Sequence, residues 1–113
     1  MKEVSIEKVI RQFIKAVNAF DVKTALVLFA TDAVIDDVSV GETFKNTSGV
    51  RNYLEKFFID PNTLTRLESL EIINNTQANA KVDFSGDFGH ETGGLNVMIN
   101  AEGLIIGINA YLD

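Results

Sequence analysis

The sequence predicts an α+β fold in which three N-terminal helices pack on one face of a curved, mainly antiparallel sheet. Apolar residues recur at helical spacing from Ile6 to Val17. Beyond Pro61, which is the only proline, the apolar period changes from about 3.6 to about 2, as expected where helices give way to strands. No repeat, low-complexity run or linker interrupts the pattern, so we expect one domain over residues 1–113.

The first helix is predicted over Ile6–Val17, with charged side chains on its opposite side and Ser5 as its N-cap. The segment Asn18–Asp21 lacks the apolar pattern and predicts a break. A second, shorter helix is expected over Val22–Phe29, with Asp21 as its cap.

A short β-branched segment over Ala33–Val40 predicts a strand, and Gly41 opens the turn that follows it. Side chains alternate between the two faces of a strand. We therefore expect Asp37 to point inward and Asp36 to point toward solvent.

A third helix is expected after Asn46, Thr47 and Ser48, each of which can cap it, and Pro61 follows its end. The rest of the chain alternates with the period of strands, and the last three strands form a meander. The expected strands are one through Leu70 and Ile72, one over 78–85, one over 95–100 and one over 104–112, with turns at 74–76 and 100–103.

Charge and composition exclude several classes of function. Ten basic and 16 acidic residues give a net charge of −6, which repels nucleic acid and anionic membranes, so we expect neither as a partner. The chain has no cysteine, and its single histidine shows no metal-ligand spacing, so neither a metal nor a cofactor is expected. Residues 1–5 lack the apolar core of a secretory signal, and no apolar run reaches the roughly 20 residues of a membrane helix. A cytoplasmic protein is the expectation.

Two segments of the first half resemble the opening of NTF2-like proteins, most closely the ketosteroid isomerase and SnoaL-like polyketide cyclase branch of that superfamily. They are Val9–Asp21 and Ala25–Asp37, which contain the N-x-x-D break at 18–21, the L-F-A-x-D-A helix end at 28–33 and the acidic strand. Val50–Leu54 is similar to the third helix of the family, and Asn100–Ile105 to its last hairpin.

This resemblance implies a cystatin-like cone, in which the sheet wraps the first helix and leaves an apolar cavity. It also implies a homodimer through the outer face of the sheet. In the isomerase, an aspartate at the end of the first strand is the general base, and a tyrosine and a protonated aspartic acid stabilise the enolate. The base position falls on Asp37, but the two donor positions fall on Phe13 and Leu95, which cannot donate. Since one oxyanion donor is worth about 10²–10³ in rate, steroid isomerase activity is not expected.

The cavity, if open, is a small-molecule site with mostly apolar walls and a few polar groups. Asn96 lies one residue from Leu95, the position of the isomerase's protonated aspartic acid. Asn96 could replace that acid as a donor only if a bulge at Gly93–Gly94 turned its side chain inward. His90, the only histidine, could carry a proton near neutral pH, but alternation along the strand places it on the outer face with Asn96, in a loop of the hairpin. Glu91 has the inward parity and is a candidate for the cavity mouth, or a plain surface carboxylate. The residues expected to bind the ligand are Phe13, Val17, Phe29, Tyr53, Leu54, Phe57, Phe84, Leu95, Asn96, Val97 and Ile108.

Two hypotheses of different class remain open at this point. In the first, the chain is a proton-transfer isomerase or cyclase in which Asp37 removes a proton next to a carbonyl. In the second, it is a non-catalytic dimeric domain that binds a small apolar molecule, or a scaffold whose cavity is filled by core side chains. The second hypothesis needs no donor pair and accounts directly for Phe13 and Leu95.

Overall fold

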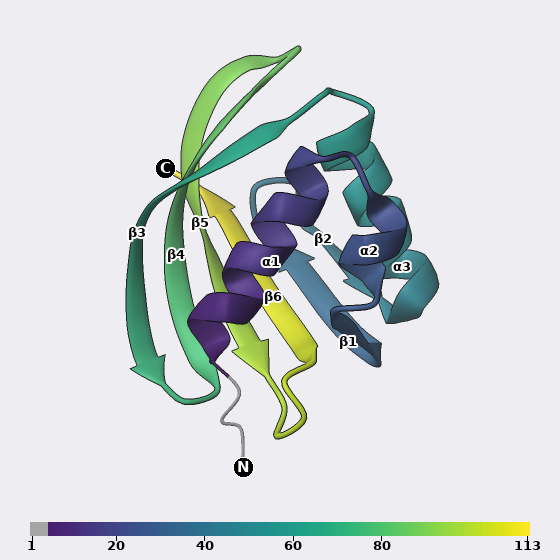
Figure 1. Ribbon diagram of the computed structural model, residues 1–113. Helices are drawn as coiled ribbons and strands as arrows, with labels where there is room; N and C mark the ends of the chain where they lie inside the picture. Colours follow the sequence, from purple (N-terminus) through teal and green to yellow (C-terminus); the bar gives the residue numbers. More distant parts are fainter. Residues whose placement is uncertain (1–4) are drawn as a thin grey trace.

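In the computed structural model, which describes residues 5–113, six strands form one sheet that curls around the first helix (Figure 1). Residues 1–4, on which the argument against a secretory signal partly rests, lie outside the described residues. The strands are β1 (Phe29–Asp37), β2 (Glu42–Lys45), β3 (Leu64–Asn74), β4 (Gln77–Gly86), β5 (Gly89–Ile99) and β6 (Ile105–Leu112). The helices are α1 (Ile6–Asn18), α2 (Val22–Leu26), α3 (Asn46–Leu54) and the π-helical segment η1 (Glu55–Ile59).

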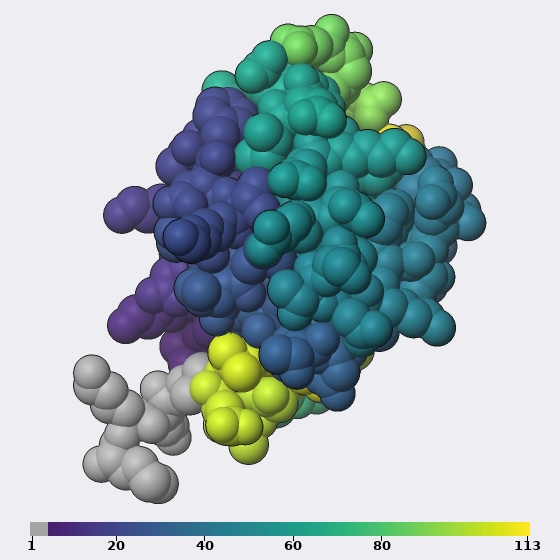
Figure 2. All heavy atoms as spheres, turned by 90° about the vertical axis from the view of Figure 1, so that its right-hand side faces the viewer, coloured from purple at the N-terminus to yellow at the C-terminus, as the bar shows by residue number. Residues whose placement is uncertain are grey.

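The strand order is β2-β1-β6-β5-β4-β3, and every neighbouring pair is antiparallel except β1 with β6. The helices lie on one side of this sheet, where α1, α2 and the α3–η1 segment together form a continuous surface (Figure 2). The predicted α+β fold with three helices on a curved, mainly antiparallel sheet is therefore confirmed.

The first helix and its cap agree with the sequence prediction. The Ser5 side chain accepts a hydrogen bond from the Lys8 amide at 3.3 Å, and the apolar stripe of α1 is buried against the sheet. Phe13, on that stripe, is 2% exposed, and burial of a side chain of this kind stabilises the fold by about 1.5–3 kcal/mol. The predicted cap of α2 is also present, since Asp21 accepts from the Thr24 amide at 3.1 Å.

Three boundaries in the first half differ from the prediction. Strand β1 begins at Phe29 instead of Ala33, where Phe29 already pairs with Ile105 of β6. Helix α2 ends at Leu26 instead of Phe29, because the chain there joins the sheet and the Leu28 carbonyl accepts from the Ile105 amide at 2.8 Å. Strand β1 ends at Asp37 instead of Val40, because the Asp37 carbonyl accepts from the Gly41 amide at 3.0 Å and closes a turn.

The segment between that turn and β3 contains a strand and a helical irregularity that were not predicted. Strand β2 pairs with β1, with Phe44 opposite Ile35. Helix α3 begins at Asn46 without a side-chain cap, so the predicted capping residues 46–48 lie inside the helix. Segment η1 then continues the helix to Ile59 with a wider turn, in which the Asp60 amide donates to the Glu55 carbonyl at 2.8 Å.

The four C-terminal strands follow the predicted order, and the turns at 74–76 and 100–103 are present, with Asn74 and Asn100 accepting backbone hydrogen bonds. His90, predicted in a loop, lies in β5. The register between β4 and β5 is continuous through Gly93–Gly94, so the bulge considered there does not form. A register shift after Met98 instead buries Ile105, which strict alternation along the strand would place on the outer face.

No helix within residues 5–113 is long and apolar enough to cross a membrane.

Candidate functional site

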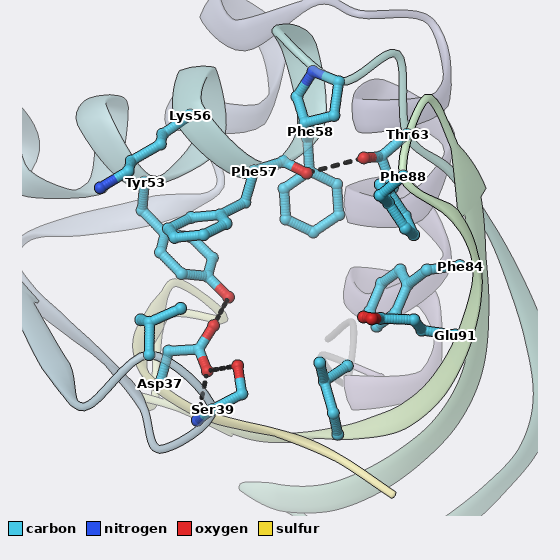
Figure 3. A pocket seen from close by; sticks show the side chains of 13 residues that line it. Asp37, Ser39, Tyr53, Lys56, Phe57, Phe58, Thr63, Phe84, Phe88 and Glu91 are labelled. Atoms are coloured by element: carbon cyan, nitrogen blue, oxygen red, sulfur yellow. Dashed lines mark hydrogen bonds between the residues drawn. The ribbon is translucent and has the colours of Figure 1, made fainter.

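A pocket of about 420 Å³ opens between the α3–η1 segment, the carboxyl ends of β1 and β6, and the β4–β5 hairpin (Figure 3). Its volume lies in the range of small-molecule sites, about 300–1,000 Å³. Five of the 13 residues that line it are aromatic, namely Tyr53, Phe57, Phe58, Phe84 and Phe88.

The hairpin wall of the pocket is anchored to the opposite wall at its tip. The Asp87 amide donates to the Pro61 carbonyl at 2.8 Å, and the Asn62 side chain donates to the Asp87 carboxylate at 3.1 Å. Gly86 makes this approach possible, because a Cβ there would lie 2.7 Å from the Pro61 carbonyl oxygen. The hairpin therefore holds Phe88 at the pocket without closing it.

Asp37 is the buried carboxylate of the pocket, with only 5% of its surface exposed. Its Oδ2 accepts a hydrogen bond from the Tyr53 hydroxyl at 2.7 Å. Its Oδ1 accepts from the Ser39 amide at 2.9 Å and from the Ser39 hydroxyl. The turn that ends β1 thus supplies two of the three donors, and α3 supplies the third.

Tyr53 is 4% exposed, and its ring lies among the rings of Phe44, Phe57 and Phe58, with centroid distances of 5.0, 4.9 and 6.2 Å. Burial, followed by the hydrogen bond to Asp37 and the charge of that carboxylate, raises the pKa of Tyr53 well above its ordinary value. The phenol therefore stays protonated at neutral pH and acts as a donor.

Phe58 closes the pocket on the side of the protein core. Its ring contacts Phe13 at a centroid distance of 6.1 Å and Phe84 at 6.0 Å, both in edge-to-face geometry. The wider turn of η1 helps to set the directions of both Phe57 and Phe58, and the Thr63 hydroxyl fixes its end by donating to the Phe57 carbonyl at 2.7 Å. The space near Phe13 is therefore filled by side chains, and the pocket begins beyond Phe58.

Two further charged groups line the pocket. Glu91 lies opposite Phe84 in the β4–β5 register, and its carboxylate faces the cavity across from Asp37 (Figure 3). Lys56 lies at the rim, where its ammonium group is 4.0 Å from the Glu42 carboxylate and 5.5 Å from the centroid of the Phe57 ring.

Solved structures with a similar fold include an NTF2-like protein from Cytophaga hutchinsonii ATCC 33406, which is 12% identical, with a TM-score of 0.82 over 99% of this chain and 93% of that one. A protein with a cystatin-like fold from Methylobium petroleophilum PM1 is 19% identical, with a TM-score of 0.84 over 99% of this chain and 78% of that one. The chain has the NTF2-like fold. RV0760c from Mycobacterium tuberculosis, in complex with estradiol-17beta-hemisuccinate, is 19% identical, with a TM-score of 0.84 over 95% of this chain and 92% of that one. No family model matches the sequence, and neither does any curated protein.

Within this NTF2-like fold, the predicted site residues divide into three groups. Asp37, Tyr53, Phe57 and Phe84 line the pocket together. Asn96 lies on the outer face of the sheet, where it accepts a hydrogen bond from Gln77 at 2.9 Å. The remaining candidates are buried in the core and do not line the pocket; they are Phe13, Val17, Phe29, Leu54, Leu95, Val97 and Ile108.

Several lining residues were not predicted as site residues, among them Ser39, Phe58 and Phe88, and two of these three carry a signal in the sequence. Ser39 follows Asp37 by two positions, the spacing at which an aspartate accepts from a nearby backbone amide in a turn. Phe88 is an aromatic residue in a glycine-flanked hairpin turn, where a polar residue is usual. Phe58 carries no such signal, because its direction depends on the π-helical turn of η1.

His90 lies on the other side of the sheet from Glu91 and does not line the pocket. Its Nε2 is 2.6 Å from Asp83, which also pairs with Arg66 at 3.2 Å. Within residues 5–113, no group of His, Asp and Glu side chains has the arrangement of a metal site.

Proposed function

We propose that this NTF2-like domain, which we take to span residues 1–113, binds a small and mainly apolar molecule in the pocket between Asp37 and Glu91. The hydrogen-bonded pair of Asp37 and Tyr53, buried at the edge of an aromatic pocket that is open to solvent, carries the proposal. Pockets of this kind combine apolar walls with a few fixed polar groups that orient the ligand. The estradiol derivative bound by RV0760c supports the proposal, since that protein shares the fold.

The competing interpretation is a scaffold whose interior is filled by core side chains. Phe13 and Leu95 are each 2% exposed, so the part of the interior that they occupy is filled. The space beyond Phe58 is different, because five aromatic side chains surround a volume of about 420 Å³ there. This volume supports a ligand site over a filled core.

Thermal unfolding tests the proposal with 2-naphthol, a bicyclic phenol. At a hundredfold excess over its Kd, a ligand that binds only the native state stabilises it by about 2.7 kcal/mol. We expect a rise in Tm that Phe88→Ala reduces. Phe20→Ala is the matched control, because Phe20 is 42% exposed, close to the 45% of Phe88, and does not line the pocket. The proposal would be contradicted if the protein were stabilised neither by 2-naphthol, 2-tetralone and related bicyclic phenols and ketones, nor by benzyltrimethylammonium and its neutral isostere neopentylbenzene.

Proton transfer is the second candidate function, with Asp37 as the base. It is favoured by the position of this carboxylate, buried in the pocket wall beside a protonated phenol. Two observations favour binding over catalysis: the Asp37 oxygens already accept three hydrogen bonds, and Glu91 adds negative charge where an enolate would form. Conversion of 3-cyclohexenone to its conjugated isomer tests catalysis, since Asp37→Asn should abolish it and leave binding nearly intact. Equal turnover by both proteins would exclude this role.

We further propose that two copies pair through the outer face of the sheet. The centre of this face is neutral, with Asn79, Asn96 and Asn109 in one cross-strand row and Met98 in the next. Asn79, Asn96 and Met98 are already partly buried within one chain. A sedimentation experiment should give the mass of a dimer, and Met98→Lys should shift it to the monomer.

A further inference from the structure

The charges of the pocket, together with its aromatic rings, indicate a class of ligand. Asp37 and Glu91 face the cavity from opposite sides (Figure 3). The ion pairs within residues 5–113 include neither of these carboxylates. The pocket therefore presents negative charge on two sides, from the buried Asp37 and from Glu91, which is exposed at the hairpin wall.

The aromatic wall favours a cation in the same space. The faces of aromatic rings attract a positive charge within about 6 Å of the centroid, and this attraction increases when water is excluded. The contact of Lys56 with the Phe57 ring, at 5.5 Å, is an instance already present at the rim. The rings of Tyr53, Phe58, Phe84 and Phe88 supply further aromatic surface around the cavity itself.

Among the described residues, Lys56 is the one cation that lines the pocket, and it does not neutralise the two carboxylates. Its side chain is 62% exposed, and its nearest carboxylate is Glu42, at 4.0 Å, outside the pocket lining. In Figure 3 its ammonium group points away from the cavity. Its charge is thus directed to the rim, where solvent screens it.

The form of the cation follows from the hydrogen bonds of Asp37. Both of its oxygens already accept hydrogen bonds, from Tyr53 and from Ser39. A cation that has no N–H group therefore forgoes little binding energy at Asp37, because its attraction to the pocket comes from its charge and from the ring faces. A neutral apolar ligand, by contrast, displaces water from the Glu91 carboxylate and offers neither a charge nor a hydrogen bond in its place.

We propose that the pocket selects an organic ammonium ion with an apolar body, whose charged nitrogen lies between Asp37 and Glu91 and against the aromatic wall. This inference rests on the proposed function and names its ligand class. An anionic ligand is disfavoured by both carboxylates.

The test compares benzyltrimethylammonium with neopentylbenzene, which has the same shape but carbon in place of the charged nitrogen. Affinities are measured by isothermal titration calorimetry or by competition with 2-naphthol. We expect the cation to bind about tenfold more tightly than its neutral isostere. Equal or tighter binding of neopentylbenzene overturns the inference.

Variants locate the effect at the pocket. Glu91→Gln should lower the affinity for the cation about threefold and should not lower the affinity for neopentylbenzene, since the amide is less costly to cover than the carboxylate. Lys56→Gln should raise the affinity for the cation about twofold. Glu102→Gln makes the same change of net charge in the β5–β6 turn, outside the pocket, and should have no effect beyond about 1.5-fold. Equal losses in Glu91→Gln and Glu102→Gln would mean that only the net charge attracts the probe, which also overturns the inference.

The inference and the proposed function fail in different ways. Binding of 2-naphthol without preference for the cation overturns the inference and leaves the proposed function standing. If neither the two probes nor the bicyclic phenols and ketones bind, both are overturned.

Discussion

Replacing Tyr53 by Phe removes one oxygen and leaves the ring in place, so it isolates the hydrogen bond to Asp37. The bond is 2.7 Å long, and its two residues are 4% and 5% exposed. Hydrogen bonds to charged groups contribute about 1.5–3 kcal/mol, and the two Ser39 donors remain after the substitution. We therefore expect Tyr53→Phe to lower the free energy of unfolding by about 2 kcal/mol, and the Tm by roughly 8 °C.

Urea unfolding at neutral pH measures this loss. Tyr111→Phe is the matched control, since it removes the same atom from a half-buried tyrosine on the outer face, whose hydroxyl accepts from Asn79 at 3.3 Å. Its cost should be about 0.5 kcal/mol or less. A Tyr53→Phe loss no larger than that of Tyr111→Phe would refute the view that this hydrogen bond stabilises the pocket.

The same pair of proteins should differ in their dependence on pH. The pKa of Tyr53 is raised in the folded state above its ordinary value of 10.0, so the stability that this group contributes is fully present below pH 10. Above pH 10, ionisation of the unfolded chain removes about 1.4 kcal/mol per pH unit. The stability difference between the wild type and Tyr53→Phe should therefore shrink between pH 10 and 11. A stability difference that stays constant between pH 10 and 11 would contradict the raised pKa of Tyr53.

Two other substitutions test the surroundings of the pocket. Ser39→Ala removes the hydroxyl donor to Asp37 and keeps the amide donor, so urea unfolding should show a loss of about 1 kcal/mol, and no loss would mean that the hydroxyl bond contributes nothing. Gly93→Ala places a Cβ against the Tyr111 carbonyl oxygen, where β5 meets β6. The substitution should lower the free energy of unfolding by about 3 kcal/mol in the same assay. A loss smaller than that of Ser39→Ala would show that the two strands separate easily.

Much of the fold could be predicted because its signals are local. The apolar stripe of α1, the caps at Ser5 and Asp21 and the alternation along β4 each depend on a few neighbouring residues. The predicted end of β1, at Val40, was wrong because it too relied on a local signal. Val38 and Val40 continue the β-branched pattern, but they are 67% and 39% exposed, because the backbone turns at Asp37.

The position of the pocket could not be predicted from such local signals. Asp37 and Tyr53 are 16 residues apart, and their hydrogen bond exists only because α3 packs against the end of β1. The turn of η1 helps to direct Phe58 between Phe13 and Phe84, which fills the interior where the cavity was expected. A wider helical turn has no clear sequence signature, so the predicted ligand residues are divided between the pocket and the core.

An NMR titration of the ¹⁵N-labelled protein with 2-naphthol tests most directly whether the pocket is a ligand site. We predict that the largest amide shifts occur at Ser39, Tyr53, Phe88 and Glu91, which surround the cavity on both sides. Residues of the outer face, such as Asn96 and Asn109, should change little. Shifts confined to the outer face, or no saturable shifts at all, would contradict the account.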